Sequence, residues 1–363
     1  MSTTGYSSPL NLTRDRAGLI LEAELSTPTS AFEGTSDTDA FVYEDRAGAT
    51  RGSTHQITFA GINRNEAPRG AFEPVIGNES TGAEYTDTIN LRYLSLAGKV
   101  ENFLLEQGLV NFSKKDQEVS RLARQWAYIR ERSIINQLVG NTLVNTGYTD
   151  YGFSGGNIVT AQDSNHIVYC PDSSGTNASA AEVAADTTSV LDCGVVQDLI
   201  TRAQSTAYTA WPIVPCDTPF GSLYVLICHP TGYTQLRSSA AGEEVYDLYK
   251  AAIQGGVDLS MSPLMTAEGF IYNKTLVLKS DFCPQGITAS AAQANTRVAA
   301  FFGARAGHWV YGEGFTDGDH LGYSEHTIHR RLSMLTDTVW GFKRTIVNGE
   351  SWGAFRVVHY SAV

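Results

Sequence analysis

The stretch from Ser113 to Gly140, SKKDQEVSRLARQWAYIRERSIINQLVG, is the most regular part of this 363-residue chain. Its apolar residues recur at spacings of three and four, the period of an amphipathic helix: Val119, Leu122, Trp126, Ile129, Ile134 and Leu138. Ser113 is a good N-terminal cap with Asp116 three residues later, and Gly140 suits the residue that ends a helix. At ~1.5 Å per residue this predicts one helix over 113–140, on the order of 40 Å long.

Positive charge gathers on the same helix. It holds six basic residues, against three acidic ones, in a chain whose formal net charge is −12: Lys114, Lys115, Arg121, Arg124, Arg130 and Arg132. These side chains could face a polyphosphate or pair with carboxylates of a neighbouring molecule, and we favour the second interpretation. The acidic chain as a whole argues against a protein whose main task is to grip nucleic acid, since such proteins usually carry a basic surface.

Two strand-like stretches precede the helix. THQITFAGI at 54–62 alternates between polar and apolar residues, and a second alternating pattern runs from Tyr85 to Leu96. Between them NRNEAPRGAFEPVIGNESTG, at 63–82, is rich in Gly, Pro, Asn and Glu. The pattern predicts a long β-hairpin over 51–99 with an irregular tip. Because a two-stranded ribbon is marginal in isolation, the hairpin is expected to rest on something else.

Residues 1–50 form a polar segment without lysine, in which short apolar groups such as Leu19-Ile20-Leu21 and Phe41-Val42-Tyr43 are scattered. Such a segment has too little apolar area to fold alone, and the apolar groups favour docking on another surface. We therefore expect both this arm and the hairpin to be ordered mainly by neighbouring molecules.

The chain after the helix mixes helices and strands. Residues 141–190 are rich in Gly, Ser, Asn, Asp and Thr and are predicted to form a long surface loop. Helices are expected near 194–207 and 243–254, with strands at 222–228, 270–278, 297–302, 325–334, 338–347 and 354–359. This mixed order indicates an α+β fold rather than a doubly wound parallel sheet.

No catalytic pattern has the structural context that it needs. Gly152-Phe153-Ser154-Gly155-Gly156 matches the nucleophile elbow of serine hydrolases, but it lies in a polar stretch with no buried strand before it, so a flexible loop is favoured. The acidic and histidine residues crowded between Glu313 and His329 favour a solvated loop over a metal site. We expect no catalytic residues, no enzymatic activity, no metal and no cofactor.

The cysteines and the hydropathy bound the environment of the protein. Five cysteines (Cys170, Cys193, Cys216, Cys228 and Cys283) stand far apart without a C-x-x-C pair, which predicts reduced and mostly buried thiols. The longest aliphatic run, Leu223 to Cys228, is far shorter than the roughly 20 residues that span a bilayer. The N-terminal residues contain no apolar stretch of a signal peptide, so no membrane partner is expected.

The segment order of arm, hairpin, long helix, α+β region and returning strands is that of tailed-bacteriophage major capsid proteins. ITFAGINRNEAPRGAFEPVIGNES, YTDTINLRYLSLAGKV and the helix stretch resemble the major capsid family of N4-like podophages and their relatives. The later stretches LYVLICHPTGYTQL, GFIYNKTLVLKS, RVAAFFGARAG and GFKRTIVNGESWGAFRVV are also similar to that family. The resemblance extends from about Thr54 to Val358, while 1–50 and 141–190 match by position only.

The resemblance implies a fold of five segments. They are an N-terminal arm (1–50), an extended E-loop (51–99), a peripheral domain with the spine helix (100–194), an axial domain (195–310) and returning strands of the peripheral domain (311–363). It also implies a structural subunit that self-assembles, in the cytoplasm of a bacterial host, into pentamers and hexamers of an icosahedral shell around double-stranded DNA. Expected partners are further copies of the chain and a portal protein, with scaffolding and decoration proteins as candidates and only non-specific contact with the DNA.

Candidate contact residues lie on the E-loop and on the helix. Those on the E-loop are Arg64, Glu66, Arg69, Glu73 and Glu79, and those on the helix are its six basic residues. Two other interpretations stay open: a phage tail or surface-binding structural protein, and a hydrolase that uses Ser154. The first lysine of the chain is Lys99, at the base of the E-loop, so residues 51–98 lack the amine that covalent cross-linking by isopeptide bonds would need.

Overall fold

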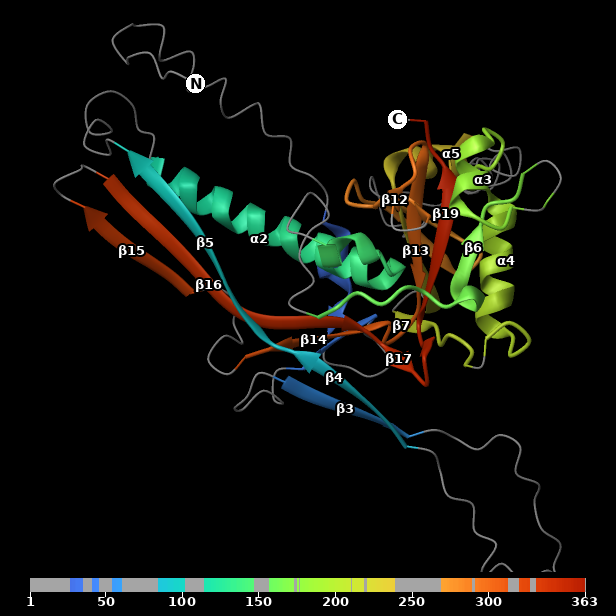
Figure 1. Cartoon of the computed structure of the whole chain (residues 1–363), viewed down its shortest axis with the longest axis horizontal. Helices are drawn as coiled ribbons and strands as arrows, with labels where there is room; N and C mark the ends of the chain where they lie inside the picture. Colours follow the sequence, from blue (N-terminus) through green and yellow to red (C-terminus); the bar gives the residue numbers. More distant parts are fainter. Residues whose placement is uncertain are drawn as a thin grey trace, which may run out of the picture.

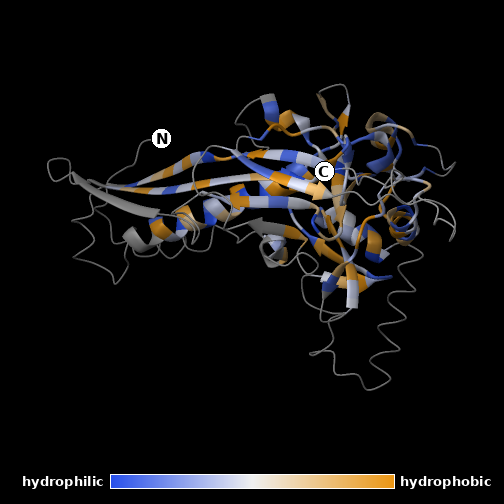
Figure 2. Cartoon of the chain, turned by 90° about the horizontal axis from the view of Figure 1, so that it is seen from below, coloured by the Kyte–Doolittle hydropathy of each residue, from blue (hydrophilic) through white to orange (hydrophobic). Residues whose placement is uncertain are grey.

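The computed structural model describes residues 27–34, 41–45, 54–60, 84–101, 114–146, 157–172, 175, 177–209, 211–218, 221–238, 269–288, 291–312, 320–326 and 331–362. Figure 1 shows an elongated molecule with two parts. A narrow wing consists of the α2 helix beside a long sheet, and a thicker end is built around a second sheet. Figure 2 shows the apolar residues concentrated in the thicker end, while the strands of the wing alternate along their length.

The predicted helix is confirmed. α2 spans Lys114–Val139, and Gly140 follows it with a φ of 65°. A Cβ at Gly140 would lie 2.7 Å from the backbone nitrogen of Gln162 and 2.9 Å from the carbonyl oxygen of Thr160. The position therefore requires glycine both for its left-handed backbone and for the close passage of the next segment.

The sheet of the wing is organised by one long strand, β16 (Arg331–Arg344). β16 pairs antiparallel with β5 (Arg92–Glu101), with β15 (His320–His326) and with β14 (Gly307–Tyr311), and β14 pairs parallel with β2 (Val42–Asp45), next to β1 (Glu33–Gly34). α2 packs on one face, where Leu96, Val119, Leu122 and Met334 meet. The Trp126 indole donates a hydrogen bond of 2.8 Å to the Thr336 hydroxyl across this contact.

Two sequence predictions in this region are wrong. The strands expected at 325–334 and 338–347 are β15 and a single unbroken β16, because pairing with β5 carries the ladder through the polar residues Thr336 to Thr338. The solvated loop expected between Glu313 and His329 contains β15, because ladder hydrogen bonds to β16 satisfy the backbone of this polar segment.

The second sheet has the strand order β6-β19-β13-β8-β10-β9, with β7 added beside β8. Its strands are β6 (Ile167–Tyr169), β7 (Cys216–Thr218), β8 (Gly221–Cys228), β9 (Gly269–Tyr272), β10 (Thr275–Lys279), β13 (Thr296–Phe302) and β19 (Ala354–Tyr360). Small paired strands complete the region: β11 (Ile287–Thr288) with β12 (Ala291–Ala292), and β17 (Ile346–Val347) with β18 (Glu350–Ser351).

Helices and a buried core surround this second sheet. α3 (Ala180–Ala185), α4 (Cys193–Gln204) and α5 (Pro230–Ser238) lie beside it (Figure 1). The helix and strand predicted at 194–207 and 222–228 are confirmed as α4 and β8. The strand predicted at 270–278 is a hairpin instead, because Asn273 and Lys274 adopt positive φ and reverse the chain between β9 and β10.

The predicted surface loop at 141–190 is also wrong for its described part. β6 pairs parallel with β19 at the edge of the second sheet, and Val159, Val168, Cys170 and Val183 are buried. Its backbone is satisfied by specific side-chain bonds; for example, the Asn145 carboxamide donates to the Val159 carbonyl at 2.8 Å and accepts from the Val159 amide at 2.9 Å. Isolated apolar residues among polar ones have no period, which is why the sequence indicated a loop.

Sheet membership does not follow the expected segment borders. β6, from the expected peripheral segment 100–194, and β19, from the returning segment 311–363, both join strands of 195–310. β14, at the end of 195–310, belongs to the sheet of the wing instead. The helix predicted at 243–254 and the Ser154 loop lie outside the described residues.

The prediction of reduced, mostly buried cysteines is confirmed. All five cysteines are buried as free thiols. Burial raises the pKa of the Cys170, Cys228 and Cys283 thiols far above the usual value, which leaves them protonated and poor nucleophiles.

Candidate inter-subunit surfaces

The predicted hairpin is confirmed at its base. β3 (Thr54–Ala60) and β4 (Glu84–Asn90) pair antiparallel, from Thr54 opposite Asn90 to Ala60 opposite Glu84. Residues 61–83 lie outside the described chain, and with them Arg64, Glu66, Arg69, Glu73 and Glu79. Figure 1 shows β3 and β4 crossing the wing sheet and extending away from it.

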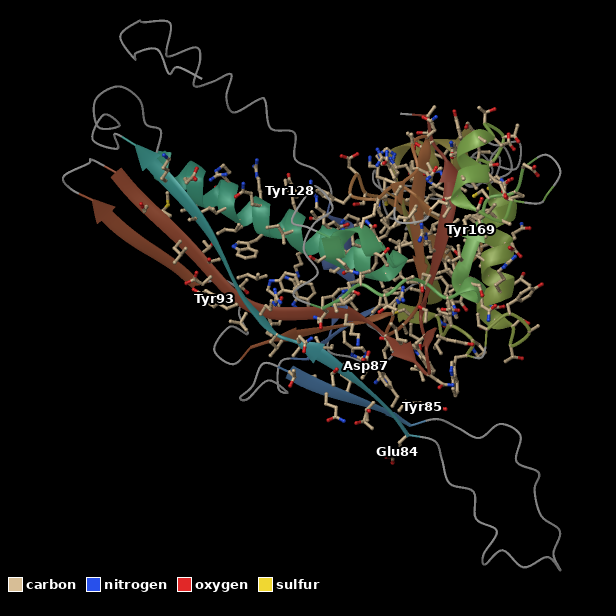
Figure 3. All side chains as sticks on the ribbon, in the orientation of Figure 1. Glu84, Tyr85, Asp87, Tyr93, Tyr128 and Tyr169 are labelled. Atoms are coloured by element: carbon tan, nitrogen blue, oxygen red, sulfur yellow. The ribbon has the colours of Figure 1, made fainter. Side chains whose placement is uncertain are left out.

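Contacts within the chain hold the hairpin base. The Asn157 carboxamide accepts a hydrogen bond from the Asn90 amide at 2.7 Å and donates one to the Asn90 carbonyl at 3.1 Å. Lys343 forms an ion pair with Asp87, which Figure 3 places on β4, and donates to the Thr88 carbonyl at 3.2 Å. The base is therefore part of the folded subunit, contrary to the expectation that neighbours order the whole hairpin.

The hairpin covers only part of one sheet face. An apolar cluster of Ile57, Ile89, Leu91, Val310 and Val339 seats it on the face of β16 that α2 does not cover. Further along the same face, alternate residues of β5 and β16 stay accessible. We call this region the open face, and it consists of Tyr93, Ser95, Ala97, Ser333, Leu335 and Asp337.

Apolar side chains are exposed on the open face. Tyr93 is 59% exposed and Leu335, which lies opposite Ala97, is 40% exposed (Figure 3 labels Tyr93 on β5). A hydrogen bond from the Tyr93 phenol to Asp337, together with the negative charge of that carboxylate, raises the pKa of Tyr93. Apolar groups gathered on one uncovered sheet face are typical of an interaction surface.

The basic residues of α2 do not form one continuous patch. The Arg121 guanidinium donates a hydrogen bond of 2.9 Å to Glu118 on the same helix. Arg130 lies 4.6 Å over the Trp309 ring and Arg132 lies 5.1 Å over the Phe282 ring, so both pack on their own subunit. Arg124 is exposed, and Lys114 and Lys115 occupy the first turn of α2. Interface roles for the last three, and for the hairpin-tip residues, stay predictions.

The described part of the arm docks on its own body. The short helix η1 (Pro28–Phe32) brings Phe32 to Phe41 and Phe302, with ring centroids 5.2 and 6.4 Å apart. Glu131 of α2, which is only 1% exposed, accepts hydrogen bonds from the Thr29 amide at 3.0 Å, from the Thr29 hydroxyl and from the Ser280 hydroxyl at 3.0 Å. The scattered apolar groups predict that the arm docks on a surface. They do not indicate that this surface belongs to the same chain.

Burial raises the pKa of Glu131 to about 7, while the bonds from Thr29 and Ser280 lower it by smaller amounts. The folded-state pKa is above the unfolded value, so this group favours folding below about pH 4.5, and the contribution declines as the pH rises toward 7. Relative to Glu131→Gln, which does not titrate, the wild-type protein should lose on the order of 3 kcal/mol of stability across this window.

Urea unfolding of both proteins across this pH range measures the effect. The difference between the two proteins removes the contributions of other groups, such as His359, whose pKa burial lowers to about 4. A difference in unfolding free energy that does not change with pH would show that Glu131 titrates normally.

Enzymatic sites find no support in the described chain. Among these residues no three His, Cys, Asp or Glu side chains gather as a metal site would require. His166 and His359 are fully buried, and His166 contacts Asp163 at 2.6 Å, which fits structural roles. None of the described helices has the length and apolar character that a membrane crossing needs.

Comparison with solved structures shows which proteins share this arrangement. The chain is similar to the capsid of Ralstonia phage GP4, with a TM-score of 0.75, 17% identity and 94% of each chain covered. It is also similar to the cyanophage Pam1 capsid (TM-score 0.67, 17% identity, 94% of each chain) and to the capsid of Helicobacter pylori bacteriophage KHP30 (0.63, 12%, 99% of each chain). The α+β fold is thus that of phage capsid proteins. Comparison with curated proteins gives no match.

The model of the phage capsid protein family matches residues 3–363, almost the entire chain. The chain therefore belongs to this family and is a structural subunit of a phage capsid. The resemblance to phage capsid proteins, which the segment order indicates, is confirmed for the family. The tail-protein and hydrolase interpretations are not favoured.

Proposed function

We propose that this chain is the major capsid subunit of a tailed bacteriophage, assembling as pentamers and hexamers into an icosahedral shell around double-stranded DNA. The proposal rests on membership of the capsid family together with a hairpin that leaves the body at Ala60 and Glu84 while an apolar sheet face stays open. The resemblance of quoted stretches to the capsid family of N4-like podophages supports this particular class.

In this proposal the open face supplies one side of the contact between subunits. Tyr93 and Leu335 offer apolar area, and residues 61–83 of a neighbour, with Arg64, Glu66, Arg69, Glu73 and Glu79, supply the other side. Extended subunits of this kind bury interfaces of obligate size, from roughly 2,000 Å² upward, so that no single contact needs to be strong.

Contact with DNA is proposed as weak and non-specific. A net charge of −12 opposes tight binding to phosphates, whereas the exposed Arg124 and the first-turn Lys114 and Lys115 give local attraction. A portal protein is a further proposed partner, and scaffolding and decoration proteins are candidates. Assembly is proposed to take place in the host cytoplasm, before the subunit becomes part of the virion.

Negative-stain electron microscopy of the purified full chain tests the proposal. Closed shells of uniform diameter are expected, because each subunit carries both the projecting hairpin and a surface for it. Fibres or isolated trimers would support a tail or surface-binding protein instead. We also propose that the protein has no enzymatic role; ester hydrolysis that disappears in Ser154→Ala would overturn this.

Shells of this protein are expected to contain no covalent links made by the hairpin. Isopeptide formation needs an amine nucleophile, and no lysine precedes Lys99, which lies in β5. Arginine cannot replace it, because the guanidinium stays protonated. Boiling assembled particles in detergent and reductant should release one band at 39.3 kDa. A ladder of multimers that survives this treatment would contradict the expectation.

A further inference from the structure

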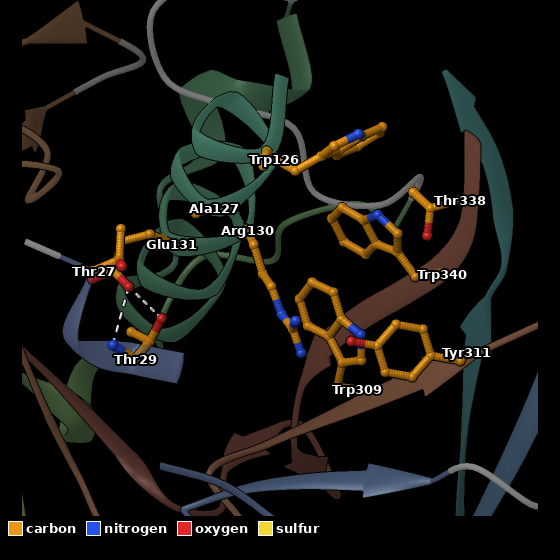
Figure 4. A pocket seen from close by; sticks show the side chains of 11 residues that line it. Thr27, Thr29, Trp126, Ala127, Arg130, Glu131, Trp309, Tyr311, Thr338 and Trp340 are labelled. Atoms are coloured by element: carbon orange, nitrogen blue, oxygen red, sulfur yellow. Dashed lines mark hydrogen bonds between the residues drawn. The ribbon is translucent and has the colours of Figure 1, made fainter. Parts of the chain in front are cut away.

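A pocket of about 260 Å³ lies between α2 and the wing sheet, beside η1. Figure 4 shows Trp126, Ala127 and Arg130 of α2 on one side, and Trp309, Tyr311 and Trp340 from β14 and β16 on the other. For comparison, an apolar cavity of roughly 150 Å³ already admits a benzene molecule. The pocket therefore has room for a leucine-sized side chain.

The walls of the pocket are aromatic and partly basic. Trp309 and Trp340 stack with their ring centroids 4.3 Å apart, and the Arg130 guanidinium lies over Trp309. The indole nitrogen of Trp309 is buried and has no hydrogen-bond partner among the described residues. An occupant that suits these walls combines an aliphatic side chain with hydrogen-bond acceptors, which an extended peptide segment supplies.

The arm reaches the edge of this pocket. Thr27, the first described residue, and Thr29 both line it, and Glu131 fixes Thr29 there. Twenty-six residues precede Thr27, and the nearest of them are Leu19-Ile20-Leu21-Glu22-Ala23-Glu24-Leu25-Ser26. In an extended chain, residues two apart point to the same side, so an extended approach to Thr27, which lines the pocket, would turn Leu25 toward it. Two residues of chain span at most about 7 Å, so Leu25 can reach the pocket from Thr27.

We propose that Leu25 of the same chain occupies the pocket and that residues 21–26 lie along α2 over Ala123 and Ala127. These two small side chains, one helical turn apart, allow a peptide backbone to approach closely. Tethering favours the subunit's own arm over that of a neighbour, because a short linker gives an effective concentration in the millimolar range. This inference goes beyond the proposed function and does not depend on shell formation.

Amide hydrogen exchange of the unassembled full-length subunit tests the proposal. Exchange at residues 21–26 should be at least about tenfold slower than in a free peptide of the same sequence. Leu25→Asp, which places a charge in the pocket, and Ala127→Trp, which fills it, should each remove this protection. Leu10→Asp, a matched change earlier in the arm, should leave it intact.

Three results would overturn the proposal. The first is exchange at 21–26 in the wild-type subunit as fast as in the free peptide. The second is protection that increases with protein concentration, which would assign the pocket to the arm of a second copy. The third is a native mass above that of the polypeptide, which Ala127→Trp abolishes, because this would assign the pocket to a small ligand. If the Ala127→Trp variant does not fold, the Leu25→Asp variant alone tests the proposal, because Leu25 is not among the residues that form the described body.

Discussion

Replacing residues 61–83 with Asn-Gly is expected to abolish closed shells while leaving the subunit folded. Ala60 and Glu84 face each other in the β3–β4 ladder, so a two-residue turn can close the hairpin there, and Asn-Gly is the sequence that such turns prefer. The base keeps its contacts to Asn157 and Lys343, because both partners lie outside the deleted segment. What the variant loses is the part proposed to reach a neighbour.

Electron microscopy and urea unfolding together measure this effect. The variant should unfold at nearly the same urea concentration as the wild-type protein, and no shells should form at concentrations at which the wild-type protein assembles completely. Thr201→Ala, at an exposed position of α4, is a control with a small change away from the hairpin and the open face. Normal shells formed by the shortened variant would show that assembly does not need residues 61–83.

Substituting Gly341 is expected to give a large loss of stability. Gly341 lies in β16 opposite Val310, where β4 crosses the sheet, and a Cβ there would lie 2.3 Å from the Asn90 carbonyl oxygen. The clash is with the Asn90 backbone, which two hydrogen bonds to Asn157 hold in place, so the crossing cannot relax by rotating a side chain. We expect Gly341→Val to cost roughly 3 kcal/mol or more, and Gly341→Ala less.

Chemical denaturation of the two variants measures the loss as a shift of the urea midpoint. Gly349→Ala is a matched control, because a Cβ there meets no atom within 4 Å. Gly349 has a φ of 82°, which is somewhat unfavourable for alanine. The stability that Gly349→Ala loses therefore measures backbone strain without steric overlap. Equal losses of stability in Gly341→Ala and Gly349→Ala would show that β4 does not contact β16 as closely as described.

The elements predicted correctly from sequence are those with a strong local period. α2 has apolar residues at spacings of three and four with a terminal Gly140, and β8 is a short continuous apolar run. Each pattern therefore indicates which residues of its own segment are buried. The hairpin base was predicted from alternation together with a tip rich in Gly and Pro. These features depend on residues within one segment of the chain.

The elements that were missed depend on distant partners. β6 is a strand because it pairs with β19, nearly two hundred residues later, and its three residues carry no period of their own. β16 continues through Thr336 and Asp337 because β5 and α2 supply its partners. Such pairings connect segments whose proximity only the folded chain determines.

The surfaces for assembly were predicted only in part. Basic residues on α2 appeared as one group in the sequence, yet Arg130 and Arg132 stack on aromatic rings of their own subunit. The exposed Tyr93 and Leu335 were not predicted, because alternation alone does not tell which of two sheet faces a helix will cover. The arm anchor at Glu131 was also missed, since a single carboxylate in a helix has no sequence signal for burial.

Amide exchange along the hairpin, measured in unassembled subunits and in shells, tests most directly whether neighbouring copies complete this subunit. Residues 61–83 should exchange rapidly before assembly and slowly afterwards. Residues of β5, which are paired with β16 inside the subunit, should be protected in both states and provide the internal reference. Equal protection of residues 61–83 in the two states would contradict the proposed role of the hairpin in joining one subunit to the next.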